Sequence, residues 1–457
     1  MTPDVRALVV SAVITVLVSA VAWQVLEKQR ERFAFQVGAW VLAGVGLLGF
    51  AFWGFALLLG NGTFPNSSED PDWARPVMTA AIPAAGLLGG SVAVAISIRK
   101  QRTSEASEEL AVVRALRERF NTCAGQLAHD SAAVRLAGVY ALAALADDWH
   151  ERGDRKEAQV CIDLLCAYQR TPRLEPLDEP SRWTPAQQGE TEVRTTISRV
   201  IRDHLVPTQH GRSPAWQGYT FSLANAVFDG GVHLFDNVVI DEGTILDLRS
   251  ARTENGGLLS FRGARFSGDG ILAIESATFE GGGVTFEGAV FEDQTKVGFA
   301  FVHFGGEVTT FESVQIKSGA RVAFFRSNFN HHSKYAALEP NEVNFRNVVI
   351  DGGRLQFMFT HLETAAVFDR LHMMDGELRF DARLFKPVSF TEARFDGGDV
   401  SFAHTGFLSD EAYLHFGGAT CSDTVVIEGP WDGVLPFRYP RMSKSDPEAP
   451  EAGDLDS

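Results

Sequence analysis

The chain of 457 residues is poor in the residues on which redox and metal chemistry depend. It has only four cysteines, Cys123, Cys161, Cys166 and Cys421, and no CxxC motif. Cys161 and Cys166 are five positions apart in a segment with helical spacing, so they lie on different faces. We therefore expect buried thiols that behave as small apolar side chains, in preference to a disulfide or a metal site. No cofactor is predicted.

Common catalytic motifs are absent too. The sequence has no Walker loop, no GxSxG elbow and no HExxH pair. The run Gly281-Gly282-Gly283 is followed by neither Lys-Ser/Thr nor a helix, so it indicates a turn and not a phosphate loop. His331 and His332 have no third ligand nearby in sequence, which favours a solvated loop over a metal site. No catalytic, cofactor-binding or metal-binding residue is assigned, and we expect a protein that is not an enzyme.

Positive charge is scarce relative to negative charge. The chain has 41 Lys and Arg against 58 Asp and Glu, a net charge of −17. Between Ala215 and Asp432 there are 30 acidic and 16 basic residues, a net of −14. Such a surface argues against nucleic acid as a direct ligand. It leaves open that the acidic surface imitates DNA.

The sequence contains a short motif, or phrase, that is repeated between Phe221 and Thr420. It consists of an apolar residue, then small or polar residues that often include Ala, and a second apolar residue five positions after the first. Ser260–Phe266, Thr285–Phe291 and Ser389–Phe395 are three copies. The copies recur about once every dozen positions, and Gly-Gly pairs recur at twice that interval. The runs are too short for helices, so they predict a right-handed parallel β-helix of about 25 residues per coil.

The repeat assigns side chains to the inside or the outside of the coil. Phe261, Phe286 and Phe311 recur at the interval of one full coil and are predicted to stack in one internal ladder. Most acidic residues fall in variable slots that we expect to face solvent, for example Glu275, Glu287, Glu312 and Asp381. Carbohydrate-cleaving β-helix enzymes need carboxylates gathered on one face, so this scatter disfavours that alternative. A β-sandwich is a further alternative for the fold.

The first hundred residues differ in character from the rest. Segments 7–26, 35–59 and 77–98 carry no formal charge, and each is long enough to cross a bilayer. Basic residues follow the first and the third segment, namely Lys28, Arg30, Arg32, Arg99, Lys100 and Arg102. They predict that the loop after the first segment and the chain after the third segment face the cytoplasm. We expect a membrane domain at 1–102 in a multi-pass cell-membrane protein. A cleaved signal peptide ending at 20–22, or a third segment that is only a buried helix, are alternatives.

Three further regions follow the membrane domain. Residues 103–206 are rich in Ala, Leu, Arg and Glu, and the run Ser131–Ala146 places its apolar residues on one face, as in a small HEAT-like helical domain. Residues 207–432 are the β-helix domain. Residues 433–457 comprise the end of a cap, formed by Trp431–Tyr439, and an acidic tail expected to be disordered.

The repeat phrase resembles that of bacterial pentapeptide-repeat proteins, in which a small residue lies two positions before a central Leu or Phe. Ala264 with Phe266, and Ala393 with Phe395, occupy those two positions. The membrane segments, the basic residues after the third segment and the Ala-rich helical run together resemble membrane-anchored pentapeptide-repeat proteins of high-GC bacteria. That class implies no established activity. Each pair of five-residue repeats is followed here by an insert that contains Gly. We therefore expect a larger and flatter coil than the square coil of the family.

These features predict a non-enzymatic, membrane-tethered scaffold or protein-interaction module that presents an acidic β-solenoid in the cytoplasm. Its expected contacts are membrane lipid and an unidentified protein, and Gly86 and Gly90 would allow a homo-oligomer. The alternatives are a DNA-mimicking protein that binds gyrase and a carbohydrate-active β-helix enzyme. The insert Asn330–Asn341 breaks the period and is the candidate for partner specificity.

Overall fold

The computed structural model describes residues 74–173, 182–207, 214–330, 342–422, 425–429 and 443–444, with side chains from Ile96 onward except at 426–427 and 443–444. The predicted segments 7–26 and 35–59 lie outside these residues, as do His331, His332 and the predicted cap Trp431–Tyr439. The chain divides into two compact units, Met1–Ala115 and Leu116–Ser457.

Helix α3 (Ala74–Leu127) is the longest element, with 54 residues, and it begins in the first unit. It contains the whole of the predicted segment 77–98. The side chains of α3 are described only from Ile96 onward, and among the residues with described side chains no helix combines the length and the apolar character needed to cross a bilayer.

Three shorter helices follow: α4 (Ala132–Glu151), α5 (Arg155–Arg170) and α6 (Pro185–Leu205). The starts of α5 and α6 are capped by side chains. The Asp154 side chain accepts a hydrogen bond from the N–H of Glu157, and Thr184 and Gln187 form a reciprocal capping box ahead of α6. Helix α4 packs against both α5 and α6 through a buried apolar face, as the periodicity of this region predicts.

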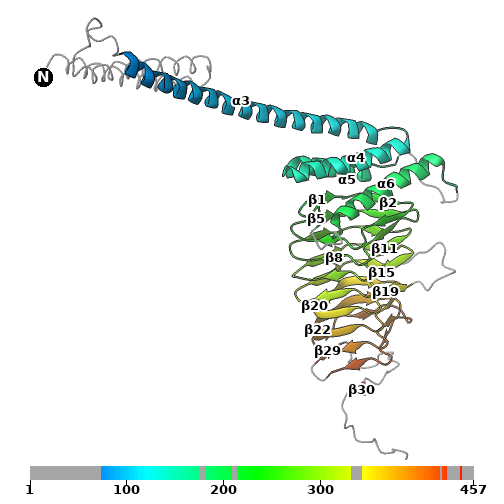
Figure 1. Ribbon diagram of the computed structural model, residues 1–457. Helices are drawn as coiled ribbons and strands as arrows, with labels where there is room; N and C mark the ends of the chain where they lie inside the picture. The colour runs from blue at the N-terminus through cyan, green and yellow to red at the C-terminus, as the bar shows by residue number, and fades with distance from the viewer. Residues whose placement is uncertain are drawn as a thin grey trace, which may run out of the picture. The chain divides into compact units, whose positions relative to one another are not determined.

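The remaining chain winds into a parallel β-solenoid in which each coil has four short sides (Figure 1). Thr220 pairs with Ile245 and Ile245 with Ile271, so the interval between these partners is the length of one coil. The predicted parallel coil and its predicted length are thus confirmed. The first side contains β1 (Thr220–Ser222), β5 (Ile245–Asp247), β9 (Ile271–Ala273), β13 (Lys296–Ala300), β17 (Arg321–Phe325), β25 (Asp399–Ser401) and β29 (Val426–Glu428).

The other three sides are formed by equally short strands. The second side contains β2 (Val227–Asp229), β6 (Arg252–Glu254), β10 (Thr278–Phe279), β14 (His303–Phe304), β18 (Asn328–Phe329) and β26 (Gly406–Phe407). The third contains β3 (Val232–Leu234), β7 (Leu258–Ser260), β11 (Gly283–Thr285), β15 (Val308–Thr310), β19 (Glu342–Asn344), β21 (Ala365–Val367), β23 (Val388–Ser389) and β27 (Leu414–His415). The fourth contains β4 (Val239–Ile240), β8 (Arg265–Phe266), β12 (Val290–Phe291), β16 (Gln315–Lys317), β24 (Arg394–Phe395), β28 (Thr420–Cys421) and β30 (Ser443–Lys444).

Two long strands lie in the sixth and seventh coils, and each of them replaces three short strands. Strands β20 (Val349–Leu362) and β22 (His372–Leu384) each run along the fourth, first and second sides without a break. They pair in parallel with three irregularities in register, one of them at Phe359. The coil therefore keeps its four-sided path although the corners are drawn out into strand.

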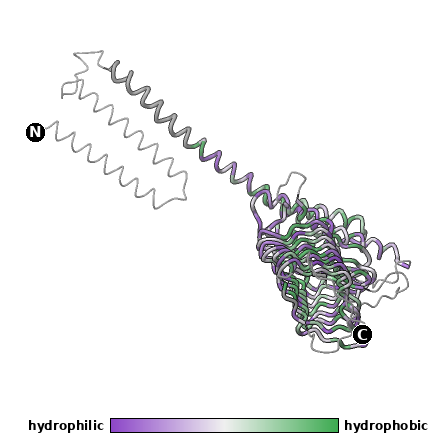
Figure 2. Tube along the Cα trace, turned by 90° about the horizontal axis from the view of Figure 1, so that it is seen from below, coloured by the Kyte–Doolittle hydropathy of each residue, from purple (hydrophilic) through white to green (hydrophobic). Residues whose placement is uncertain are grey.

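Phenylalanine ladders fill the interior. Phe261, Phe286 and Phe311 are fully or almost fully buried and stack face to face, with ring centroids 4.9 and 5.2 Å apart, as predicted. The ladder continues from Phe235 to Phe416, and a second one runs from Phe299 to Phe402. Apolar and polar residues alternate along the coils (Figure 2). Each buried ring contributes on the order of 2–3 kcal/mol.

Gly256 and Gly257 lie at the corner between the second and third sides, where glycine is required for two reasons. Gly256, the first residue of a Gly-Gly pair, has φ +76°, which a residue with a Cβ adopts at a cost. A Cβ on the second residue, Gly257, would lie 2.0 Å from the carbonyl oxygen of Phe228 in the coil before. The Gly-Gly pairs therefore allow the chain to turn and consecutive coils to approach closely.

Helices α5 and α6 cover the open edge of the first coil (Figure 1). The Gln159 amide donates to the carbonyl of Thr220 at 2.7 Å and accepts from its N–H at 3.0 Å. It thus makes the two hydrogen bonds that a neighbouring strand would make. Other helix side chains donate to carbonyl groups of the same edge, in the pairs Arg170–Ser222, Gln169–Val227 and Arg202–Asp236.

A buried ion pair completes this junction. Arg173 follows α5 and binds both carboxylate oxygens of Asp229, at 2.6 and 2.7 Å, and each side chain is only 6% exposed. The helices after Leu116 therefore belong to one compact unit with the solenoid, whose first coil they cap.

Candidate functional site

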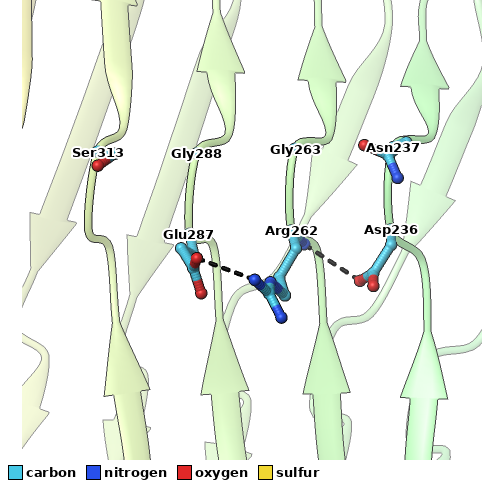
Figure 3. Close-up of a pocket in the computed structure, with 7 residues that line it drawn as sticks. All are labelled: Asp236, Asn237, Arg262, Gly263, Glu287, Gly288 and Ser313. Carbon is cyan, nitrogen blue, oxygen red and sulfur yellow. Dashed lines mark hydrogen bonds and ion pairs between the residues drawn. The ribbon is translucent and has the colours of Figure 1, made fainter.

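A shallow hollow of about 390 Å³ runs along the corner between the third and fourth sides (Figure 3). Arg262 spans it: its guanidinium donates to Glu287 at 3.0 Å, and its backbone N–H donates to Asp236 at 3.3 Å. The hollow exists because Gly263 and Gly288 have no side chain to fill it. Glu287 is paired with the Arg262 guanidinium, and Asp236 accepts from the Ser260 hydroxyl and the Arg262 N–H, so we assign the hollow no chemistry.

A cavity of about 360 Å³ lies among the helices. Glu190 at its centre accepts hydrogen bonds from Tyr168 at 2.8 Å and Arg194 at 2.7 Å, and Arg135 lies 3.3 Å away. Arg194 also donates to the carbonyls of Gln169 and Thr171 at the end of α5. Burial raises the pKa of the Tyr168 phenol, which stays protonated. The network holds helices together and supplies no nucleophile.

The buried thiols and the buried imidazole are equally unsuited to catalysis. Burial raises the pKa of Cys161 and of Cys166 to about 12, so neither forms a thiolate near neutral pH. Burial lowers the pKa of His233 to about 4, and its ring contacts Ser198 at 3.1 Å. All four cysteines are free; three are buried, as predicted, and Cys421 is partly exposed. No cluster of metal-ligating side chains occurs among the described residues.

The outward carboxylates mostly lie where the repeat places them. Glu275 is exposed, and Glu287 and Glu312 are partly exposed. The prediction is wrong for Asp381, which is only 9% exposed. The guanidinium of Arg379 covers it, with nitrogen-to-oxygen distances of 2.8 and 3.0 Å.

One part of the first side has a composition unlike the rest of the solenoid. We call it the basic patch and define it as Lys296–Phe301, Arg321–Arg326 and Arg354–Phe359, on β13, β17 and the middle of β20. The three segments pair in parallel, with their first residues opposite one another. None contains Asp or Glu, although the solenoid has 30 acidic residues between Ala215 and Asp432. Four cations therefore lie on three neighbouring strands without an intervening carboxylate.

The cations of the basic patch also differ in their partners. Elsewhere most solenoid cations bind a carboxylate, as Arg265 and Lys317 bind Glu292 at 3.0 and 2.9 Å. In the patch Arg354 makes a long contact of 3.6 Å with Glu377. Within the described ranges, no carboxylate pairs with the other three cations, which are Lys296, Arg321 and Arg326.

Exposed aromatic rings border these cations. Phe301 is 54% exposed and Phe359 is 63% exposed, at the corner where the first side ends. The Arg326 guanidinium lies between them in the stack, 5.9 Å from the Phe301 ring centre and 5.4 Å from that of Phe325. Phe325 meets Phe301 and Phe359 edge to face, with centroids 5.7 and 6.0 Å apart. The patch thus combines free positive charge with exposed apolar surface.

The backbone at this corner is strained. Phe301, Arg326 and Phe359 have φ of 57°, 50° and 54°, in the left-handed region that bulky residues rarely occupy. The earlier coils place smaller polar residues at the same corner, also at positive φ: Asn225, Ser250 and Ser276. Phe and Arg tolerate this conformation less well than Asn does, so the fold retains large side chains here at a conformational cost.

Sequence reasoning missed the basic patch. The patch is recognised by the lack of Asp and Glu in its three segments. These segments are far apart in the sequence and become neighbours only when the coils are aligned. The first two segments are one coil length apart, but the step from Arg321 to Arg354 is longer because the insert lies between them. The predicted specificity insert itself lies at 331–341, outside the described residues, apart from Asn330.

Comparison of the chain with models of protein families, with curated proteins and with solved structures finds no match. The fold and its surfaces therefore carry the functional argument by themselves.

Proposed function

We propose that this protein is a non-enzymatic, membrane-tethered interaction module of the pentapeptide-repeat type, whose solenoid lies in the cytoplasm. The observation that carries the proposal is the extended lateral surface of the solenoid. Its third side alone consists of eight parallel strands in one sheet. Stacked repeats of this kind offer long, regular surfaces, and such surfaces typically bind other macromolecules.

The helical cap supports the same proposal. Because α5 and α6 satisfy the backbone groups of the first coil, that edge is not available for strand addition. We propose that a partner binds the flanks of the solenoid. Many of their charges form ion pairs between neighbouring coils, as Arg262 does with Glu287.

Membrane attachment rests on the sequence. Three uncharged segments of bilayer length precede the folded unit, and cations follow the first and the third. A reporter that is active only in the cytoplasm, fused after Ser457, tests the topology. We expect an active fusion that remains in the membrane after alkaline extraction. An inactive fusion, together with activity of an export-dependent reporter at the same site, would reverse the orientation.

The interaction role is tested with the full chain in native membranes. A photo-crosslinking residue placed at Gly298 on the first side, and separately at Val308 on the third, samples two exposed flanks. A scaffold should give discrete adducts from one flank and none from the other. Equal, diffuse labelling from both would count against a defined binding surface.

The DNA-mimic alternative is separated by an enzyme assay. The purified full chain is added to a gyrase supercoiling reaction. Inhibition at micromolar or lower concentration, lost when outward Asp and Glu are neutralised, would replace the scaffold proposal by DNA mimicry. The basic patch weighs against this alternative, because a DNA mimic needs uninterrupted negative charge along the solenoid.

A further inference from the structure

We propose that the basic patch docks the flank of the solenoid onto an anionic lipid surface. Three of its cations have no carboxylate partner in the described part of the chain, and they are spaced along adjacent strands. Exposed Phe301 and Phe359 border them. Cations that bind acidic headgroups, next to apolar rings that enter the interface, are the chemistry by which proteins adsorb to membranes.

The strain at the corner is a second, independent observation. Asn or Ser fills this position in the first three coils, yet Phe301 and Phe359 occupy it in the fourth and sixth at positive φ. A folding role does not explain them, since both rings project into solvent. A surface role does, because each ring adds apolar area where the cations are free.

A single-stranded nucleic acid is the competing ligand, since basic patches with aromatic rings also bind bases. The charge of the solenoid favours lipid. Outside the patch, the range from Ala215 to Asp432 has 30 acidic and 12 basic residues, a net of −18. A long polyanion would meet this negative charge, whereas single headgroups meet only the patch.

The inference rests on the proposed membrane attachment, because a tether raises the local concentration of lipid at the flank. Its test uses the full chain reconstituted in lipid nanodiscs of phosphatidylcholine, with or without phosphatidylserine. An environment-sensitive fluorophore is placed at Gly298→Cys in a Cys421→Ser background, since the other three cysteines are buried. Nothing lies within 4 Å of a Cβ at Gly298, so the label fits. A label at Val308→Cys on the third side is the control.

We expect a blue shift of emission at position 298 in discs that contain phosphatidylserine, and none at position 308. Added salt should diminish the shift, as for any contact between exposed charges. Two variants should abolish it: Phe301→Asn with Phe359→Asn, which restores the type of residue found at the equivalent corners, and Lys296→Gln with Arg321→Gln and Arg326→Gln. The triple change Arg262→Gln, Arg265→Gln, Arg370→Gln removes the same charge from ion-paired sites and should leave the shift intact.

The phenylalanine variant loses the ring contacts with Phe325, but Asn suits positive φ better than Phe, so we expect it to fold. Its melting temperature is measured beside that of the parent, and an unchanged value shows that a loss of response does not come from unfolding. Identical emission in both kinds of disc, or an unchanged shift in both patch variants, would overturn the proposal while leaving membrane attachment intact.

If the chain does not integrate, the attachment fails, and the same labelled chain is then mixed with preformed vesicles of the two compositions. There, the cation variant should bind phosphatidylserine vesicles roughly a hundredfold more weakly. Patch-dependent binding of a single-stranded oligonucleotide without any vesicle response would overturn the lipid proposal and assign the patch to nucleic acid.

Discussion

At the scale of single residues, the Phe ladder and the outward slots next to it differ sharply in their contribution to stability. Phe286 is fully buried and stacks between Phe261 and Phe311. Phe286→Ala should therefore cost about 3–5 kcal/mol, from lost burial and a cavity that rigid neighbours cannot fill. Glu287→Ala removes one exposed ion pair with Arg262 and should cost less than about 1 kcal/mol. Denaturant unfolding of the two variants measures the difference, and comparable losses would contradict the inward and outward assignment.

His233 makes stability depend on pH in a predictable direction. Burial is the largest influence on its pKa, which falls from 6.5 to about 4, and Arg173 and Arg194 lower it further, whereas Asp229 raises it. Between these two values the unfolded chain binds a proton that the folded chain does not. Stability should therefore fall as the pH drops from about 6.5 towards 4, by roughly 3 kcal/mol in total.

The change His233→Gln should remove this part of the pH dependence. The quantity to compare is the slope of unfolding free energy against pH, because the substitution also alters packing at every pH. His404 is exposed, and His404→Gln is the matched control that keeps the parent slope. A His233→Gln variant with the full parent slope would show that other groups cause the acid destabilisation.

At the scale of elements, the junction between the helices and the first coil depends on the buried pair Arg173–Asp229. Arg173→Met leaves the Asp229 carboxylate buried without its cation and should cost about 3–5 kcal/mol. The double variant Arg173→Met with Asp229→Leu removes both charges and should recover most of that loss. Arg252→Met breaks an exposed pair with Glu254 and should cost less than about 1 kcal/mol. Chemical denaturation gives all three values, and a double variant as unstable as the single one would contradict the charge-burial argument.

The elements also show how far sequence reasoning reached. The coil of about 25 residues in the first coils, the ladder through Phe286 and the positive φ of Gly256 follow from local patterns, because such patterns recur from coil to coil. The docking of α5 on β1 does not follow, since it depends on side chains such as Gln159 meeting backbone that is 61 residues away. Covered Asp381 was missed for a similar reason: the repeat gives the direction of its side chain but not the position of Arg379 over it.

At the scale of the whole molecule, the solenoid should tolerate loss of one complete coil. Deleting 265–289 removes one coil length and joins Ala264 to Val290, which already pairs with Arg265 of the coil before. The new junction reads Phe261-Arg-Gly-Ala followed by Val290-Phe291, almost the same as the native phrase at Phe286. Each coil interacts chiefly with its two neighbours, so the remaining coils keep their contacts. The free energy of unfolding should therefore fall only by the contribution of the one coil that is removed.

The matched control is a smaller deletion that breaks the coil. Removing 265–280 takes out the strands β8, β9 and β10 and leaves a coil with one of its four sides. The Phe ladders then cannot align across the gap, and their apolar faces are exposed. We expect the whole-coil deletion to give a folded, monodisperse chain with a single reduced melting temperature, and the partial deletion to aggregate. If the partial deletion proved the milder of the two, the coil would not be the unit on which this fold depends.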